Sequence, residues 1–144
     1  MRGRFLMNQE GELQIRHGRC LCGDIAFVAR GKPLWVLHCH CRSCRLNTGS
    51  AMATFVGYRP EQVAFTGSRS QFNSSPGVRR CFCARCGTPV SFEADRYPGE
   101  IHLYIGAFDD PESLPPQAHV HFDEHIHWLN IADSLPRKPG VGYE

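Results

Sequence analysis

The residues of this chain with the clearest chemical potential are its eight cysteines, which fall into three tight groups. The groups are Cys20-x-Cys22, Cys39-x-Cys41-x-x-Cys44 and Cys81-x-Cys83-x-x-Cys86. Eight cysteines in 144 residues are about 6%, below the roughly 8–10% of short secreted disulfide scaffolds. In a reducing compartment, clustered thiols are more often metal-binding or catalytic than disulfide-bonded. The spacing therefore predicts metal binding.

Two of the groups together can complete a closed zinc site. Structural zinc takes four ligands in a tetrahedron, with Zn–S bonds of about 2.3 Å. Cys83 and Cys86 form a C-x-x-C knuckle followed by Gly87, which can adopt the positive φ of a tight turn. Cys20 and Cys22 form a second pincer whose side chains point the same way on an extended backbone. Four thiolates from these pincers would fill the shell and close the site to substrate.

The remaining group supplies three thiolates, Cys39, Cys41 and Cys44, within six residues. Three protein ligands with one open position are what a catalytic zinc needs, the fourth place taking water, a substrate thiolate or a polarised oxygen. The neighbours that add proton-transfer capacity and positive charge for an anionic ligand are His40, Arg42 and Arg45.

Spacing alone does not decide which groups combine. Cys20 and Cys22 could instead close the Cys39 group, which would leave Cys81, Cys83 and Cys86 as the open triad. A second, purely structural zinc at the Cys39 group is equally compatible with the spacing. We expect Cys81 itself to be a small buried apolar residue, as most free cysteines are.

Glycine and proline breaks every eight to twelve residues predict many short strands, several of which alternate apolar and polar residues. The expected strands are Leu13–Arg16, Ile25–Ala29, Trp35–His38, Ala51–Val56, Gln62–Thr66, Ser70–Asn73, Arg79–Phe82, Val90–Glu93, Ile101–Ile105 and His119–Phe122. One short helical turn is expected at Arg42–Asn47, ended by Gly49, and another after Pro111. We expect one mainly β domain over residues 1–144, with residues 1–12 an N-terminal extension and 135–144 a surface tail.

Composition excludes several classes of protein. Sixteen basic against 14 acidic residues give a net charge of +2, which argues against a nucleic-acid partner. No apolar stretch approaches the roughly 18 residues that span a bilayer, and the start of the chain lacks a signal-peptide core. With 42% hydrophobic and 21% charged residues, the sequence predicts a globular, cytoplasmic protein without a membrane partner.

Several longer motifs carry a family resemblance. They are Gly18-Arg-Cys-Leu-Cys-Gly-Asp-Ile25, Cys39-His-Cys-Arg-Ser-Cys-Arg-Leu-Asn-Thr-Gly-Ser50, Ser74-Ser-Pro-Gly77, Arg80-Cys-Phe-Cys-Ala-Arg-Cys-Gly-Thr88, Gly106-Ala-Phe-Asp-Asp-Pro111, His119, Trp128-Leu-Asn-Ile-Ala-Asp133 and Leu135-Pro136. In this order they resemble the glutathione-dependent formaldehyde-activating (GFA) family, also called the GFA/CENP-V type, which has the Mss4-like fold. The resemblance covers nearly the whole chain after the first dozen residues.

The resemblance implies two zinc ions per chain. A structural zinc would be held by Cys20, Cys22, Cys83 and Cys86, and a second zinc with an exchangeable fourth ligand by Cys39, Cys41 and Cys44. The implied fold is mainly β, with short antiparallel sheets braced by zinc. The implied activity is carbon–sulfur bond chemistry, typified by the joining of glutathione to formaldehyde as S-hydroxymethylglutathione. Cys81 and the histidine-rich stretch 119–127 depart from the family pattern.

The histidines of that stretch are interpreted as exposed or hydrogen-bonded strand residues. Alternation would place His119 with His121, and His125 with His127, on single strand faces. His119 is the best candidate for substrate contact, because it lies on a family position. Arg80 could bind a carboxylate of a glutathione-like ligand, and the competing interpretation is a surface arginine beside an acid.

The first hypothesis is therefore a zinc-dependent carbon–sulfur lyase or synthase acting on the adduct of glutathione, or a similar thiol, with a small aldehyde. His40 and Arg45 are its catalytic candidates, and Arg42 and Arg80 its candidates for holding the thiol ligand. The alternative is a non-enzymatic, zinc-stabilised binding module, Mss4-like or CENP-V-like, for a protein or nucleic-acid partner. A homodimer is one possible assembly in either case.

Overall fold

The computed structural model describes residues 14–141, and strands dominate this part of the chain. Its single α-helix is α2 (Arg42–Thr48), and each of the ten expected strands overlaps an observed one. Short 3₁₀ turns lie at Pro60–Gln62, Ile105–Ala107, Pro111–Ser113 and Phe122–Glu124. The prediction of a mainly β fold with little helix is confirmed. The predicted extension 1–12 lies outside the described residues.

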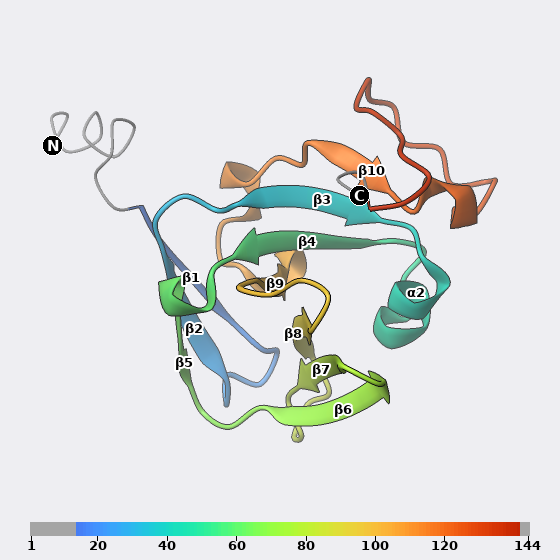
Figure 1. The fold of residues 1–144 in the computed structure, drawn as a ribbon. Helices are drawn as coiled ribbons and strands as arrows, with labels where there is room; N and C mark the ends of the chain where they lie inside the picture. The colour runs from blue at the N-terminus through green and yellow to red at the C-terminus, as the bar shows by residue number, and fades with distance from the viewer. Residues whose placement is uncertain (1–13, 142–144) are drawn as a thin grey trace, which may run out of the picture.

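A small antiparallel sheet opens the fold (Figure 1). Its strands, in spatial order, are β1 (Ile15–Arg19), β2 (Ala26–Arg30) and β5 (Val63–Thr66). Along β2 the side chains alternate, so that Phe27 and Ala29 are fully buried while their neighbours are half-buried or exposed. This alternation gives the sheet one apolar face.

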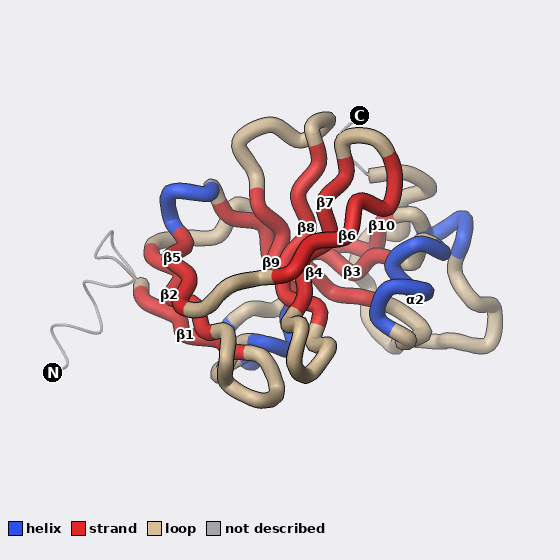
Figure 2. The backbone as a smooth tube through the Cα atoms, turned by 90° about the horizontal axis from the view of Figure 1, so that it is seen from below, coloured by secondary structure: helices blue, strands red, loops and turns tan. Residues whose placement is uncertain are grey.

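The larger sheet has seven strands in the order β10-β3-β4-β9-β8-β7-β6 (Figure 2). They are β3 (Trp35–Cys39), β4 (Ala53–Tyr58), β6 (Ser70–Ser75), β7 (Val78–Phe82), β8 (Pro89–Ala94), β9 (Ile101–Tyr104) and β10 (Ala118–Val120). All neighbours are antiparallel except β10, which pairs parallel with β3. The sheets are thus antiparallel as expected except at this one edge, which the chain reaches from β9 by a long crossover.

The two faces of the large sheet have different roles. Val56 in β4 pairs with Leu103 in β9, and both belong to the apolar core that includes Phe27 of the small sheet. The next pair, Phe55 with Tyr104, belongs to a second core on the other face, together with Cys39 and Cys44. The period of two therefore separates a structural core from the face that carries the cysteine triad.

The segment after β10 does not form the strand that was predicted to continue to Phe122. His121 leaves the strand with φ 52°, and residues 122–124 form a 3₁₀ turn, so His125 and His127 do not alternate on a strand. The chain end then runs back along β10, where the N–H of His119 donates to the carbonyl of Pro136 and that of His121 to the carbonyl of Gly140. Pro136, Lys138 and Gly140, within the stretch 135–144 expected as a surface tail, thus bond to the sheet edge, and none of residues 135–141 is buried.

No helix among residues 14–141 is long and apolar enough to cross a membrane.

Candidate metal centres and adjoining cleft

Four cysteines from two distant segments converge into one group. The Sγ atoms of Cys20, Cys22, Cys83 and Cys86 all lie within 4.8 Å of one another. The Cys20–Cys22 and Cys22–Cys83 sulfur distances are both 3.7 Å. A tetrahedral zinc with Zn–S bonds of about 2.3 Å separates its sulfurs by about 3.8 Å, whereas a disulfide needs about 2.05 Å. The donor set and its spacing fit zinc.

Backbone N–H groups support these sulfurs. The N–H of Ile25 donates to Cys20 Sγ at 3.3 Å, and that of Cys86 to Cys83 Sγ at 3.5 Å. Gly87 takes φ 81°, the left-handed conformation that a C-x-x-C knuckle requires. One pincer follows β1 and the other follows β7, so the group joins the small sheet to the large one. The fold thereby selects one of the pairings that spacing left open.

The other three cysteines form a second group at the junction of β3 and α2. Cys39 ends β3, Cys41 is the N-cap of α2 and Cys44 lies in its first turn. Their Sγ atoms lie within 4.8 Å of one another, with Cys39 and Cys44 at 3.7 Å. Cys41 Sγ also accepts a hydrogen bond from the Cys44 N–H at 3.3 Å. This one contact therefore both caps the helix and holds Cys41 close to Cys44.

The protonation states of the three thiols favour binding of a cation. The pKa of Cys39 is raised, chiefly by its hydrogen bond with Cys41, while the same bond lowers the pKa of Cys41 to about 2. One sulfur therefore keeps its proton so that its neighbour can ionise. All three can ionise together only beside a positive ion, and thiolates are favoured ligands of zinc. Zinc fits this donor set as well.

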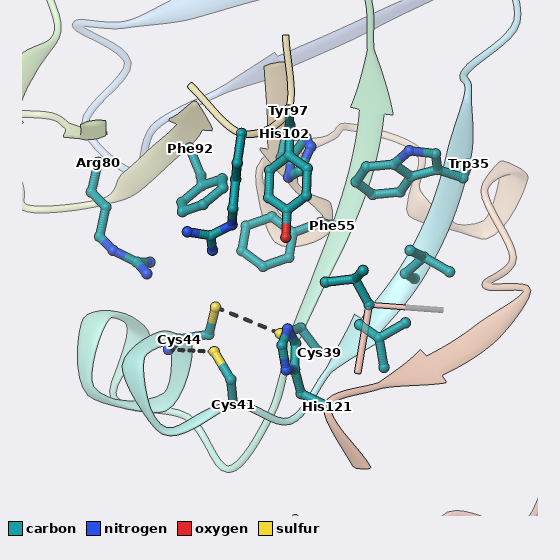
Figure 3. Close-up of a pocket in the computed structure, with 14 residues that line it drawn as sticks. Trp35, Cys39, Cys41, Cys44, Phe55, Arg80, Phe92, Tyr97, His102 and His121 are labelled. Atoms are coloured by element: carbon teal, nitrogen blue, oxygen red, sulfur yellow. Dashed lines mark hydrogen bonds between the residues drawn. The ribbon is translucent and has the colours of Figure 1, made fainter. Parts of the chain in front are cut away.

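The triad lies at the base of a cleft of about 70 Å³ (Figure 3). One group of lining residues is aromatic, namely Trp35, Phe55, Phe92, Tyr97 and His102. The rings support one another, with centroids 4.5 Å apart for Trp35 and His102 and 5.3 Å apart for Phe92 and His102. Burial lowers the pKa of His102, which keeps that ring neutral. The part of the cleft that these rings line is therefore apolar.

Two arginines, Arg80 and Arg96, line the cleft, and no carboxylate among the described residues does. Arg80 is only 8% exposed, which removes the alternative of a surface arginine paired with an acid. Its Nε donates to Ser74 Oγ at 3.0 Å and its guanidinium lies 4.9 Å from the Phe92 ring centroid. Its Nη1 is buried without a hydrogen-bond partner. A buried cationic donor is therefore left available to an anion in the cleft.

The other predicted polar residues, His40, Arg42 and Arg45, do not line this cleft. Side chains alternate along the extended chain, so His40 points away from the side that carries Cys39 and Cys41. Arg45 donates to the carbonyls of His40 and Glu124, each at 2.6 Å. The Arg42 side chain is exposed, and only its backbone N–H is tied, to Glu124 Oε1 at 2.9 Å. These three residues thus lie outside the lining of the cleft, and the Arg45 side chain links the backbone of His40 to that of Glu124.

His40 instead begins a hydrogen-bond chain that leads through the buried His119 to the exposed Asp133. Its Nε2 lies 2.8 Å from His119 Nδ1, and His119 Nε2 lies 3.0 Å from Asp133 Oδ2. Arg137 pairs with the same carboxylate. Burial lowers the pKa of His40 to about 4, while the bond from His119 holds the pKa of Asp133 well below its usual range. This chain fastens the Cys39–Cys41 loop to the C-terminal segment, and it places His119 outside the cleft lining.

Sequence reasoning missed most of the cleft wall. Arg96 and Tyr97 gave no motif, because they lie in a loop away from any cysteine in sequence, while His121 was noticed only as one of the histidines of the stretch 119–127. Phe55 and Phe92 were expected in the core, and they do pack there while also facing the cleft.

Residues 15–124 match the model of the family described as glutathione-dependent formaldehyde-activating enzyme. The chain belongs to this GFA family. The match contains all eight cysteines, together with Arg80 and His121, and ends before Asp133.

Two further proteins are similar to this chain. A protein of Schizosaccharomyces pombe named as an uncharacterized lyase is 26% identical over 107 residues, which cover 74% of this chain and 78% of the relative. A crystal structure of a Rhodobacter sphaeroides protein superimposes with a TM-score of 0.54 and 17% identity, covering 84% of this chain and 98% of the other. At that identity, the second comparison supports the fold alone.

Proposed function

We propose that this protein is a zinc-dependent carbon–sulfur lyase or synthase acting on the adduct of glutathione, or a similar thiol, with a small aldehyde such as formaldehyde. Membership of the GFA family and the similarity to a protein named as a lyase support this class of reaction. The observation that carries the proposal is the thiol triad at the base of a cleft whose lining, in the part of the chain that the structure describes, has cationic groups and no carboxylate.

The proposal places one zinc in the four-cysteine group, where it has only a structural role, and one on Cys39, Cys41 and Cys44. When bound at the triad, zinc would lower the pKa of a thiol that coordinates it, or polarise a carbonyl oxygen. Cys39, Cys41 and Cys44 would hold that ion with three thiolates and leave one position facing the cleft.

Charge balance favours binding of the substrate as a thiolate. A divalent ion with three thiolates carries a net charge of −1, and a fourth thiolate brings the site to −2. Arg80 and Arg96 bring +2 to the same cleft. Arg80 is buried and its Nη1 lacks a hydrogen-bond partner, so its charge carries an uncompensated desolvation penalty. An anion bound in the cleft would offset this penalty.

The remaining chemistry requires positioning and exclusion of water. In the synthetic direction, the thiolate sulfur forms a bond to the aldehyde carbon, the carbonyl π bond breaks, and the resulting alkoxide takes a proton from water. The lyase direction reverses these changes. The aromatic walls limit the water around the reacting atoms, and Arg80 orients a carboxylate or the developing oxyanion through Nη1. The cleft volume of about 70 Å³ suits the reacting end of an adduct better than a whole tripeptide.

Magnetisation-exchange NMR on mixtures of formaldehyde, glutathione and their adduct tests the proposal. We expect the wild type to accelerate exchange and Cys41→Ser to abolish the acceleration while the domain stays folded. Arg80→Met should raise the KM for glutathione about 10- to 100-fold, since a charge-assisted hydrogen bond contributes about 1.5–3 kcal/mol. The matched control is Arg79→Met. In the wild type, the Arg79 guanidinium lies 2.9 Å from the Asp95 carboxylate and does not line the cleft.

Undiminished exchange in folded Cys41→Ser would refute the proposed role of the triad. Metal analysis gives a second check, because the proposal requires about two zinc ions per chain, one of them responsive to glutathione. One tight zinc with no response to thiol would instead favour the non-enzymatic binding module.

A further inference from the structure

His121 has an unusual backbone conformation. Its φ is 52°, and it is the only residue other than glycine with a positive φ in the described range 14–141. Such a conformation costs about 1–3 kcal/mol and persists where the surroundings hold it. Here the His121 N–H donates to the carbonyl of Gly140 at 2.8 Å, and its carbonyl accepts the Glu124 N–H at 3.0 Å. The backbone is therefore fixed on both sides.

This conformation directs the imidazole to the cysteine triad. His121 lines the same cleft as Cys39, Cys41 and Cys44, and Figure 3 shows its ring beside Cys39 and Cys41. Its nitrogens lie outside the group of sulfurs that are within 4.8 Å of one another. The imidazole is thus a neighbour of the triad, and it would reach a bound ion by turning about its own side-chain bonds.

The other imidazole in the cleft is already engaged. His102 Nε2 bonds to Glu100 Oε1 at 2.8 Å, and its ring packs between Trp35 and Phe92. Among the described residues that line the cleft, His121 is consequently the nitrogen donor available to a metal on the triad.

Glu124 prepares His121 for such a role. Its Oε1 is held by the backbone N–H of Arg42 at 2.9 Å, and its Oε2 lies 3.8 Å from His121 Nδ1. Metal-binding histidines commonly direct the nitrogen that does not bind metal at a carboxylate or carbonyl. With Nδ1 facing Glu124, Nε2 is the nitrogen left for the cleft.

We propose that His121 Nε2 is the exchangeable fourth ligand of the metal on Cys39, Cys41 and Cys44, and that the substrate thiolate displaces it. This inference rests on the metal site of the proposed function and not on the identity of the aldehyde. In this exchange the thiol would lose its proton to water and take the place of the His121 imidazole, while Cys39, Cys41 and Cys44 would keep holding the metal. In the resting site, His121 Nε2 would then occupy the fourth position, and only a stronger sulfur ligand would displace it.

Cobalt(II) spectroscopy on the full chain tests this ligand exchange. His121→Asn is the variant of choice, because asparagine tolerates the left-handed backbone, and His121→Gly, which has no such strain, is the second variant. His127→Asn is the matched control, since His127 is exposed on the same segment and does not line the cleft. Each protein is loaded with cobalt(II), and its ligand-field and sulfur-to-metal bands are recorded before and after glutathione is added.

Cobalt(II) in the four-cysteine group should contribute constant four-sulfur bands in every protein. At the triad, the wild type and His127→Asn should add the bands of three sulfurs and one nitrogen, which change on addition of glutathione to those of four sulfurs. The His121 variants should differ before glutathione and match the wild type after it. Chelator competition should show zinc affinity at the triad reduced at least tenfold, since even an outer-shell partner is worth about 10- to 100-fold.

Two metals per chain with identical resting spectra and affinities in wild type and both His121 variants would overturn the inference and leave the proposed function standing. One metal per chain, or no response of the wild type to glutathione, would overturn the proposed function itself. The two failures are therefore distinguishable.

Discussion

Replacing Cys83 with serine should destabilise the whole fold and not only one loop. Cys83 is 2% exposed and belongs to the four-sulfur group between the two sheets. Among residues 14–141, the buried members of the apolar cluster at this junction are Cys20, Ile25, Cys83 and Val90. Half of that cluster therefore consists of proposed metal ligands.

The size of this destabilisation follows from the apolar contacts that remain at the junction when the metal is lost. Burial of Ile25 and Val90 contributes about 1.5–3 kcal/mol each, or about 3–6 kcal/mol together. A structural zinc contributes about 10–16 kcal/mol in small zinc domains. A domain of this size has a net stability of about 5–15 kcal/mol. Loss of one of the four ligands thus removes a contribution as large as the entire free energy of unfolding.

Urea unfolding followed by tryptophan fluorescence, with zinc measured on the same samples, provides the assay. Cys83→Ser should lose one zinc per chain and be largely unfolded without urea, and excess chelator should do the same to the wild type. Cys81→Ala is the matched control: Cys81 is 6% exposed and two residues away, but lies outside the four-sulfur group. It should retain both zinc ions and lose about 1 kcal/mol.

A wild-type unfolding midpoint for Cys83→Ser would refute this reasoning, because the junction would then be stable without its metal. An equally large loss in Cys81→Ala would refute it too, since simple burial of a thiol would explain both variants.

Two further predictions concern packing and pH. Gly18→Ala should destabilise the fold by about 1–3 kcal/mol in urea titrations, because the added Cβ would lie 2.2 Å from Phe27 Cζ, whereas Gly106→Ala meets no atom within 4 Å and should be nearly neutral. Equal losses would contradict the steric argument. Burial lowers the pKa of His102 in the folded protein, so below about pH 6.5 the unfolded chain binds more protons than the folded chain. The free energy of unfolding should therefore be fully retained above that pH. It should fall as the pH is lowered below about 6.5. The wild type should therefore lose more stability than His102→Asn between pH 7.5 and 5.5, and parallel losses would exclude His102 as a source.

The strands and the helix were predictable because their signals are local. Alternation of apolar and polar residues marked β8 at Val90-Ser-Phe-Glu93, and Gly49, with φ 71°, ends α2 as its position after Thr48 indicated. The bounds moved by a few residues at most elements. The failure lay after His119, where the alternation of histidines predicted strands and the backbone turned at His121. Its hydrogen bonds to Gly140 and Glu124 outweigh the local preference for an extended chain.

By itself the sequence determined the chemistry that is available: cysteine pairs and a triad at metal-binding spacing, on short strands with one helical turn. The tertiary structure decided which sulfurs meet, since the approach of Cys20 to Cys83 depends on how two sheets pack. It also decided that His40 faces away from the cleft and that Arg80 is buried within reach of it. The physical reason is that a period of two fixes which side chains share a face, while only long-range packing fixes what that face meets.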